Sequence, residues 1–294
     1  MSFSSEVKQE LAKQLSRSRH CQLAELAAIL TMEGRIGTNP LTIDLLTENP
    51  LLTKKFNILI QRIFDIDVSG ALHGEDAKRA LSAIRMEEVL EEEHPVLAGR
   101  RADGLLVQNT CCKRAFVRGA FLASGSISNP NKSYHLEIVC RSLEQAEQLK
   151  QLINGFGLDA KIVMRKNHEI VYLKEGAQVV DMLNVMEAYV SLMNLENVRI
   201  LKEIGNSVNR KVNCETANIS KTVNAAVRQI ADIKKIQETI GFDKLSPPLR
   251  EMALLRLEYP DAPLKDLGGY LDPPVGKSGV NHRLRKLSAI AEQL

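Results

Sequence analysis

The sequence predicts an α+β protein whose N-terminal part is a duplicated unit with pseudo-two-fold symmetry and whose C-terminal part is all helical. The first observation is a repeat. A segment of small and apolar residues ends in glycine at residues 26–34, and its echo lies 91 residues later at residues 117–125. A repeat of this kind is typical of a duplicated supersecondary unit. The second is a change of pattern, because beyond residue 220 the apolar residues keep only helical spacing.

Composition sets the broad class. The chain has 294 residues, of which 44% are hydrophobic and 26% charged, as in an ordinary globular protein with two domains. No apolar run approaches the roughly 18 residues of a membrane span, and residues 1–15 lack the apolar core of a signal peptide. We therefore expect a cytoplasmic protein with no membrane partner.

The net charge is +3, but the excess lies at one end. Residues 205–294 carry 14 Lys and Arg against 10 Asp and Glu. We expect any binding of polyanions at this C-terminal end.

The first repeat is predicted to contain alternating helices and strands. Gly34 is expected to end the first long helix as a C′ residue, and Pro95 to lie beyond the last. The predicted elements are helices at residues 5–33 (with a break near 16–19), 50–64 and 76–93, and strands at 41–46 and 66–72.

The second repeat follows the same order. Lys166-Asn167-His168 has the composition of a hairpin turn. The predicted elements are helices at residues 113–124, 143–156 and 177–188, and strands at 134–141, 160–165 and 169–173.

Beyond the repeats the pattern weakens over an Asn-rich stretch and then becomes helical. Ser220 or Thr222 is expected to cap a helix that Gly241 ends, and shorter helices should follow at 247–257, 264–271 and 278–293. The expected organisation is a first repeat at 1–110, a second at 111–195, a linker at 196–219 and a helical domain at 220–294.

The last two predicted helices form the strongest functional pattern. A short helix, a proline-rich turn and a longer helix, each with an apolar stripe, are typical of a helix-turn-helix. Asn and Arg side chains read base edges, whereas Lys and Ser hold phosphates. We expect base readout by Asn281 and Arg283, and phosphate contacts by Lys277, Ser278, Arg285 and Lys286. His282 completes the expected DNA-binding set. The alternative is a solvated basic helix in a small bundle.

The glycine-ended helices form the second pattern. Ala24 and Ala28, and Gly119 and Ala123, are small residues spaced four apart, which would let the two helices approach closely. Glu33 and Ser124 precede the two glycines and would converge at the helix ends. A metal-dependent nuclease needs a carboxylate from each side to hold Mg²⁺. With one Glu facing one Ser, we expect no catalytic metal and no catalytic residue.

Metal and redox sites receive little support. The five cysteines include no Cys-x-x-Cys pair, and the histidines do not lie at metal-ligand spacings. We expect reduced thiols, no structural zinc and no cofactor.

The glycine-ended helices resemble the LAGLIDADG motif of homing endonucleases, and residues 264–287 resemble the helix-turn-helix of primary sigma factor region four. In this order, with residues 114–126 and 278–286, they resemble the bacterial WhiA family over essentially the whole chain. The resemblance implies a duplicated LAGLIDADG scaffold that has lost nuclease chemistry, followed by a helix-turn-helix domain. It also implies a Gram-positive regulator associated with sporulation, or with cell division and chromosome segregation.

We therefore expect a non-enzymatic, sequence-specific protein that binds double-stranded DNA, regulates transcription and is associated with the nucleoid. Two alternatives stay open. In one, the N-terminal domain recruits a protein partner, such as another transcription or division factor, and the protein is a structural adaptor. In the other, Glu33 supports a residual Mg²⁺-dependent nickase.

Overall fold

The computed structural model describes residues 2–47 and 49–294 and divides the chain into two compact units between Lys202 and Glu203. Helices and two antiparallel sheets build the first unit, whereas the second consists of helices and turns. The predicted fold class is therefore confirmed. Among the described residues, no helix is both long and apolar enough to cross a membrane.

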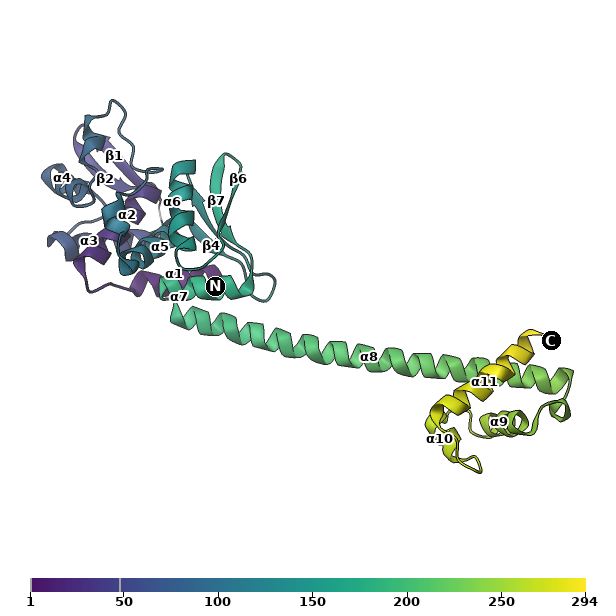
Figure 1. Cartoon of the computed structure of the whole chain (residues 1–294). Helices are drawn as coiled ribbons and strands as arrows, with labels where there is room; N and C mark the ends of the chain where they lie inside the picture. The colour runs from purple at the N-terminus through teal and green to yellow at the C-terminus, as the bar shows by residue number, and fades with distance from the viewer. Residues whose placement is uncertain (1, 48) are drawn as a thin grey trace. The chain divides into compact units, whose positions relative to one another are not determined.

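The two repeats give the first unit two similar halves. The first half contains α1 (Phe3–Lys13), α2 (Arg19–Glu33), β1 (Gly34–Thr38), β2 (Leu41–Leu45), α3 (Pro50–Phe64), β3 (Leu72–His73), α4 (Gly74–Ala83) and two 3-10 turns, η1 (Glu87–Glu91) and η2 (Gly104–Val107). The second contains α5 (Thr110–Ser124), β4 (Gly125–Ile127), β5 (Leu136–Cys140), α6 (Leu143–Asn154), β6 (Lys161–Arg165), β7 (His168–Leu173) and α7 (Gly176–Met186). Figure 1 shows α2 and α5 between the two sheets.

The sheets share a starting motif and differ in size. Their strand orders are β1-β2-β3 and β4-β5-β7-β6, and all pairs are antiparallel. In each half a strand begins directly at the glycine that follows the helix, with Gly34 opposite Leu45 and Gly125 opposite Ile138. These two strands are absent from the sequence prediction, because they are short and contain glycine and polar residues.

Two other predicted elements of the first half are wrong in extent. The strand expected at 66–72 is reduced to Leu72–His73. The helix expected at 76–93 ends at Ala83, Arg85 takes a left-handed φ of 59°, and η1 follows. In the second half the expected hairpin is confirmed, since β6 pairs with β7 and Lys166 and Asn167 have φ of 50° and 62°.

The glycines after α2 and α5 serve a purpose other than the expected C′ role. Gly34 and Gly125 have extended backbones, with φ of −73° and −82°. A Cβ atom would lie 2.4 Å from the Leu30 carbonyl oxygen at Gly34, and 2.3 Å from Phe121 Cδ2 at Gly125. Glycine is therefore required by the direct turn from helix into strand and not by a left-handed conformation.

Close contact between α2 and α5 builds the core of the first unit. Nearly every residue of α2 from Ala24 to Met32 is buried, and α5 is buried from Ala115 to Leu122. A Cβ atom at Gly119 would lie 2.7 Å from the carbonyl oxygen of Glu25 and 3.0 Å from Cβ of Ala28. The small residues therefore permit the close helix approach that the sequence predicts.

A buried charge cluster lies in the same interface. Arg118 donates to both carboxylate oxygens of Glu25 at 3.1 Å, and Lys55 Nζ lies 3.0 Å from Glu25 Oε1. These three side chains are at most 1% exposed. Burial lowers the pKa of Lys55, and the neighbouring Glu25 carboxylate opposes that shift. Because buried charges are tolerated only when paired and hydrogen-bonded, the cluster favours one register of α2 against α5.

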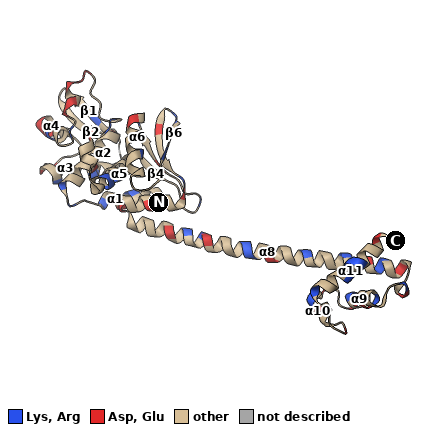
Figure 2. Ribbon diagram, viewed as in Figure 1, with Lys and Arg blue, Asp and Glu red and all other residues tan. Residues whose placement is uncertain are grey.

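One helix, α8 (Tyr189–Thr239), occupies the range expected to hold the linker at 196–219. The helix start expected at Ser220 or Thr222 is therefore wrong, because helical structure runs through both residues. Residues of both charges recur along α8 (Figure 2). The predicted segment boundaries stay predictions.

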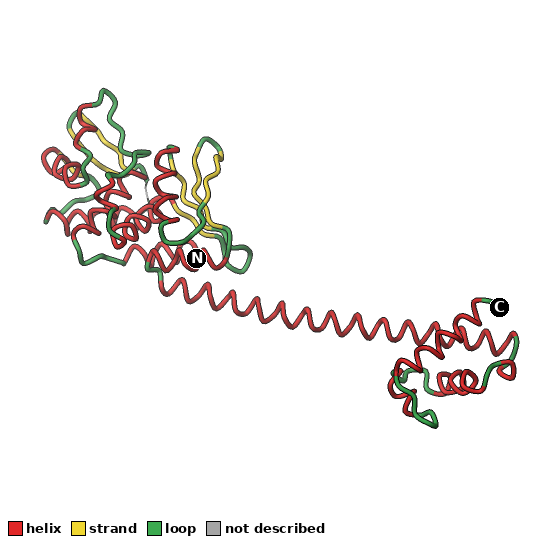
Figure 3. Tube along the Cα trace, in the orientation of Figure 1, coloured by secondary structure: helices red, strands yellow, loops and turns green. Residues whose placement is uncertain are grey.

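Short helices complete the second unit: η3 (Phe242–Lys244), α9 (Pro247–Glu258), α10 (Leu264–Gly269) and α11 (Lys277–Glu292). Loops connect them (Figure 3). Gly241 has the left-handed φ, 73°, expected of a residue beyond a helix end. These helices share one core, to which α8 contributes Ile233 and Ile236.

We expect Gly119→Ala to lower the free energy of unfolding of the first unit by about 1–3 kcal/mol, because the added methyl group overpacks the α2–α5 contact. Urea unfolding followed by circular dichroism measures the change. Gly205→Ala is the matched control: among the described residues, no atom outside the adjoining backbone of its own helix would lie within 4 Å of its Cβ, and alanine favours helix by about 0.5–1 kcal/mol. Equal stability of Gly119→Ala and wild type would contradict the proposed close contact.

Candidate nucleic-acid interface

The arrangement of α10, a turn and α11 is fixed by close backbone contacts. The Val275 N–H donates to the Gly268 carbonyl at 2.9 Å. A Cβ atom at Gly268 would lie 2.0 Å from the Val275 carbonyl oxygen, and one at Gly279 would lie 2.4 Å from Val275 Cγ1. The turn that directs α11 therefore requires glycine at position 268, whereas a Cβ atom at position 279 would require the Val275 side chain to move.

The two faces of α11 have opposite character. Val280, Leu284, Leu287 and Ala291 are buried against the core of the second unit. Six of the residues predicted to contact DNA are exposed: Lys277, Ser278, Asn281, His282, Arg285 and Lys286. Figure 2 shows basic residues on α11. The exposed set has positions at helical spacing, such as 278, 282 and 285, opposite the buried stripe.

Arg283 is placed differently from the other six. Its side chain is 24% exposed, and its Nη1 lies 3.7 Å from Glu251 Oε2 on α9. That nitrogen is buried and has no hydrogen-bond partner among the described residues. Arg283 thus lies beside the α9–α11 contact and not on the exposed face, so Asn281 is the better placed of the two predicted base readers.

The ends of α2 and α5 meet as the sequence predicts, since Ser124 Oγ lies 3.7 Å from the sulfur of Met32, the residue before Glu33. Arg141, at the end of β5, contacts the acidic end. Its Nη2 donates to Glu33 Oε2 at 3.1 Å, and its Nε donates to the Met32 carbonyl at 3.2 Å. The Glu33 carboxylate is therefore paired with a guanidinium, and Ser124 supplies no charge on the other side.

Carboxylates of the sheets also have cationic partners in the chain. Arg35 Nε donates to Asp44 at 2.7 Å across β1 and β2. At the equivalent place in the second half, Glu137 accepts from Ser126 at 3.2 Å and lies 3.7 Å from Arg165. These sheet surfaces carry charges of both signs, which makes them poor sites for a DNA backbone.

The structure also brings together four residues that the sequence analysis did not combine: His20, Cys21, Cys111 and Cys112. Spacing along the chain could not reveal them, because two residues come from α2 and two from α5. The signal that was present is the repeat itself, since the two pairs are 91 residues apart.

Comparison with known proteins gives two family matches. The WhiA C-terminal HTH domain matches residues 208–291, and the WhiA LAGLIDADG-like domain matches residues 113–205. Three similar proteins are each named "Probable cell division protein WhiA". They come from Lachnoclostridium phytofermentans, Lachnospira eligens and Clostridium beijerinckii, are 50%, 48% and 46% identical, and align over 100% of this chain and 99%, 98% and 99% of their own lengths.

A crystal structure of full-length DUF199/WhiA from Thermatoga maritima has a similar fold. Its TM-score is 0.61, with 24% sequence identity over 100% of this chain and 99% of that chain.

We expect Gly268→Ala to destabilise the second unit by about 1–3 kcal/mol, because its methyl group would collide with the Val275 carbonyl. The neighbouring Gly269→Ala is the control, since no atom of the described residues outside the adjoining backbone of its own helix would lie within 4 Å of its Cβ. Thermal unfolding followed by circular dichroism compares them. The interpretation of the turn fails if both variants melt together with wild type.

Proposed function

Because this chain belongs to the WhiA family, we propose that it is a sequence-specific DNA-binding protein that regulates transcription. The observation that carries the proposal is the exposed polar and basic face of α11, on a helix that follows a glycine-constrained turn. A helix presented in this way fits the major groove, with Asn281 near base edges and Lys286 near phosphates.

The regulated process is cell division, the process in the names of the similar proteins. A role in chromosome segregation or sporulation is the finer form of the same proposal. Such a protein would be associated with the nucleoid in the cytoplasm.

The first unit acts as a scaffold without nuclease activity. Two-metal cleavage needs carboxylates that are free to bind Mg²⁺. The Arg141 guanidinium bound to Glu33 competes with a cation for that carboxylate, and Ser124 is a weaker, neutral ligand.

DNA recognition is tested with two duplexes: one enriched from a random pool by the wild-type protein, and one scrambled. We expect Asn281→Ala to weaken binding to the enriched duplex by about 1–3 kcal/mol, with little change on the scrambled one. Lys286→Ala should weaken binding to both and lower the slope of log affinity against log salt by about one unit.

Lys244→Ala is the control, because it removes an exposed lysine of the second unit that lies outside α11. Its affinities should match wild type. If Asn281→Ala and Lys286→Ala also bind both duplexes like wild type, α11 is not the recognition helix.

For the first unit, we expect supercoiled plasmid to stay intact with the protein and Mg²⁺ or Mn²⁺, since the Glu33 carboxylate is paired with Arg141. Gel electrophoresis of the plasmid measures nicking. Nicking by the wild type that Glu33→Gln abolishes would instead support a residual nickase.

A further inference from the structure

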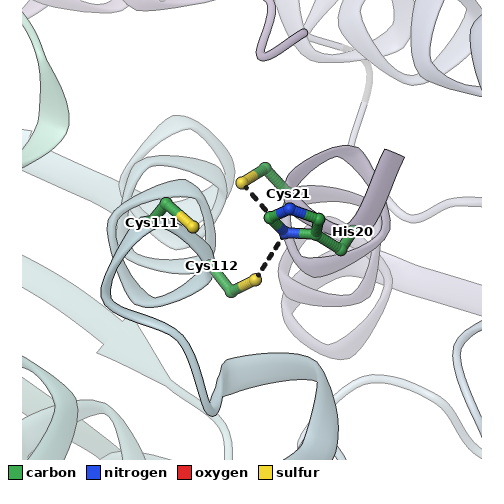
Figure 4. A group of neighbouring side chains, drawn as sticks. All are labelled: His20, Cys21, Cys111 and Cys112. Atoms are coloured by element: carbon green, nitrogen blue, oxygen red, sulfur yellow. Dashed lines mark hydrogen bonds between the residues drawn. The ribbon is translucent and has the colours of Figure 1, made fainter. Parts of the chain in front are cut away.

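Four metal-binding side chains converge where α2 and α5 begin (Figure 4). His20 and Cys21 come from α2, and Cys111 and Cys112 from α5. Their ligand atoms, one nitrogen and three sulfurs, all lie within 4.8 Å of one another. His20 Nδ1 lies 3.1 Å from the Cys112 sulfur and 3.4 Å from the Cys21 sulfur.

The convergence follows from the pseudo-symmetry of the fold. His20 and Cys21 are the second and third residues of α2, and Cys111 and Cys112 are the second and third residues of α5. Both pairs are separated by the 91 residues of the repeat. The close packing of α2 against α5 therefore places two equivalent pairs of ligands opposite each other.

We propose that His20, Cys21, Cys111 and Cys112 bind one zinc ion, which joins the N-terminal ends of α2 and α5. Three thiolates and one imidazole are a common ligand set of structural zinc sites. A tetrahedral site with ordinary zinc–ligand bonds has sulfur–sulfur edges of about 3.8 Å and sulfur–nitrogen edges of about 3.6 Å. The observed spacing requires only small side-chain movements to reach these values.

Zinc would bind to this cluster by displacing protons from the thiols. Burial raises the pKa of Cys21 to about 12, and the neighbouring Cys111 and Cys112 contribute to that rise. Burial, followed by the charge of Cys111, also raises the pKa of Cys112. Burial disfavours the charged thiolate form. A bound Zn²⁺ would compensate that charge, because coordinating thiols are deprotonated by the metal. Both helix N-termini stabilise the resulting thiolates.

The ligand set also defines the class of metal and its role. Thiolates select zinc over hard cations such as Mg²⁺. Four protein ligands complete the coordination and leave no open position for a substrate, so the site is structural. Cys21 and Cys112 are buried, whereas His20 and Cys111 are exposed. A metal ion can therefore enter from the surface.

The test uses the full-length protein, purified under reducing conditions without chelators. Elemental analysis should find one zinc per chain. Cobalt substituted for zinc should give the intense visible bands of a tetrahedral thiolate site. A strong zinc chelator should lower the melting temperature of the wild type.

His20→Ala and Cys111→Ala remove exposed ligands, so the core keeps its packing and folding can be checked by circular dichroism. Loss of a ligand should cost more than the 10–100-fold in metal affinity that typically follows loss of an outer-shell partner. The chelator should then no longer change the melting temperature. Cys214→Ala is the matched control: it removes an exposed cysteine of α8, outside the cluster, and should keep one zinc per chain.

Three results would overturn the proposal. The first is a folded, reduced wild type that contains no zinc and shows no cobalt bands. The second is a Cys21–Cys112 disulfide, found by mass spectrometry without reductant, in place of the metal. The third is a His20→Ala variant that binds zinc as tightly as Cys214→Ala.

Discussion

The close approach of α2 and α5 is the contact on which the first unit depends. It exists because Gly119 has no side chain where the Glu25 backbone passes, and because Ala28 is small. The contact also buries the Glu25 carboxylate, which pairs with the charges of Arg118 and Lys55. Such a buried network contributes little net stability, but breaking it leaves an unpaired charge. It therefore acts mainly on register: a shifted helix would separate Glu25 from its partners.

That register determines what meets at each end of the helix pair. At the N-terminal ends the equivalent positions carry similar chemistry, with His20 and Cys21 facing Cys111 and Cys112. At the C-terminal ends the equivalent positions, Glu33 and Ser124, have diverged. The same backbone symmetry thus brings together four metal-binding side chains at one end, and one carboxylate with one hydroxyl at the other. Arg141 reinforces the difference, because it contacts Glu33 from the second half, whereas the Ser124 hydroxyl lies against the sulfur of Met32.

The sequence predicted the elements whose apolar residues are periodic and buried. The bounds of α3, Pro50–Phe64, match the prediction, since its buried residues keep helical spacing and Asn49 caps it. The strands β1 and β4 were missed because a few residues after a glycine carry no periodic signal. Continuous helix in α8 was missed for another reason. Asn206, Asn209 and Asn213 have low helix propensity, and apolar residues such as Leu201 and Ile219 are exposed, so burial gives no pattern to detect. The cysteine and histidine cluster was missed because its two pairs lie on different helices, and only the 91-residue offset of the repeat relates them.

On α11 the sequence predicted more of the candidate site, because packing and recognition compete for the same helix. Val280, Leu284, Leu287 and Ala291 face the core, where they make up four of the eleven buried residues of its cluster. Helical geometry then assigns the opposite face to positions such as 278, 282 and 285. Arg283 follows Asn281 by only two residues and so projects from another side, where α9 lies close enough for contact with Glu251. Residue type alone grouped Arg283 with Asn281. Their positions around α11 separate them, because Asn281 is exposed whereas Arg283 lies beside Glu251 of α9.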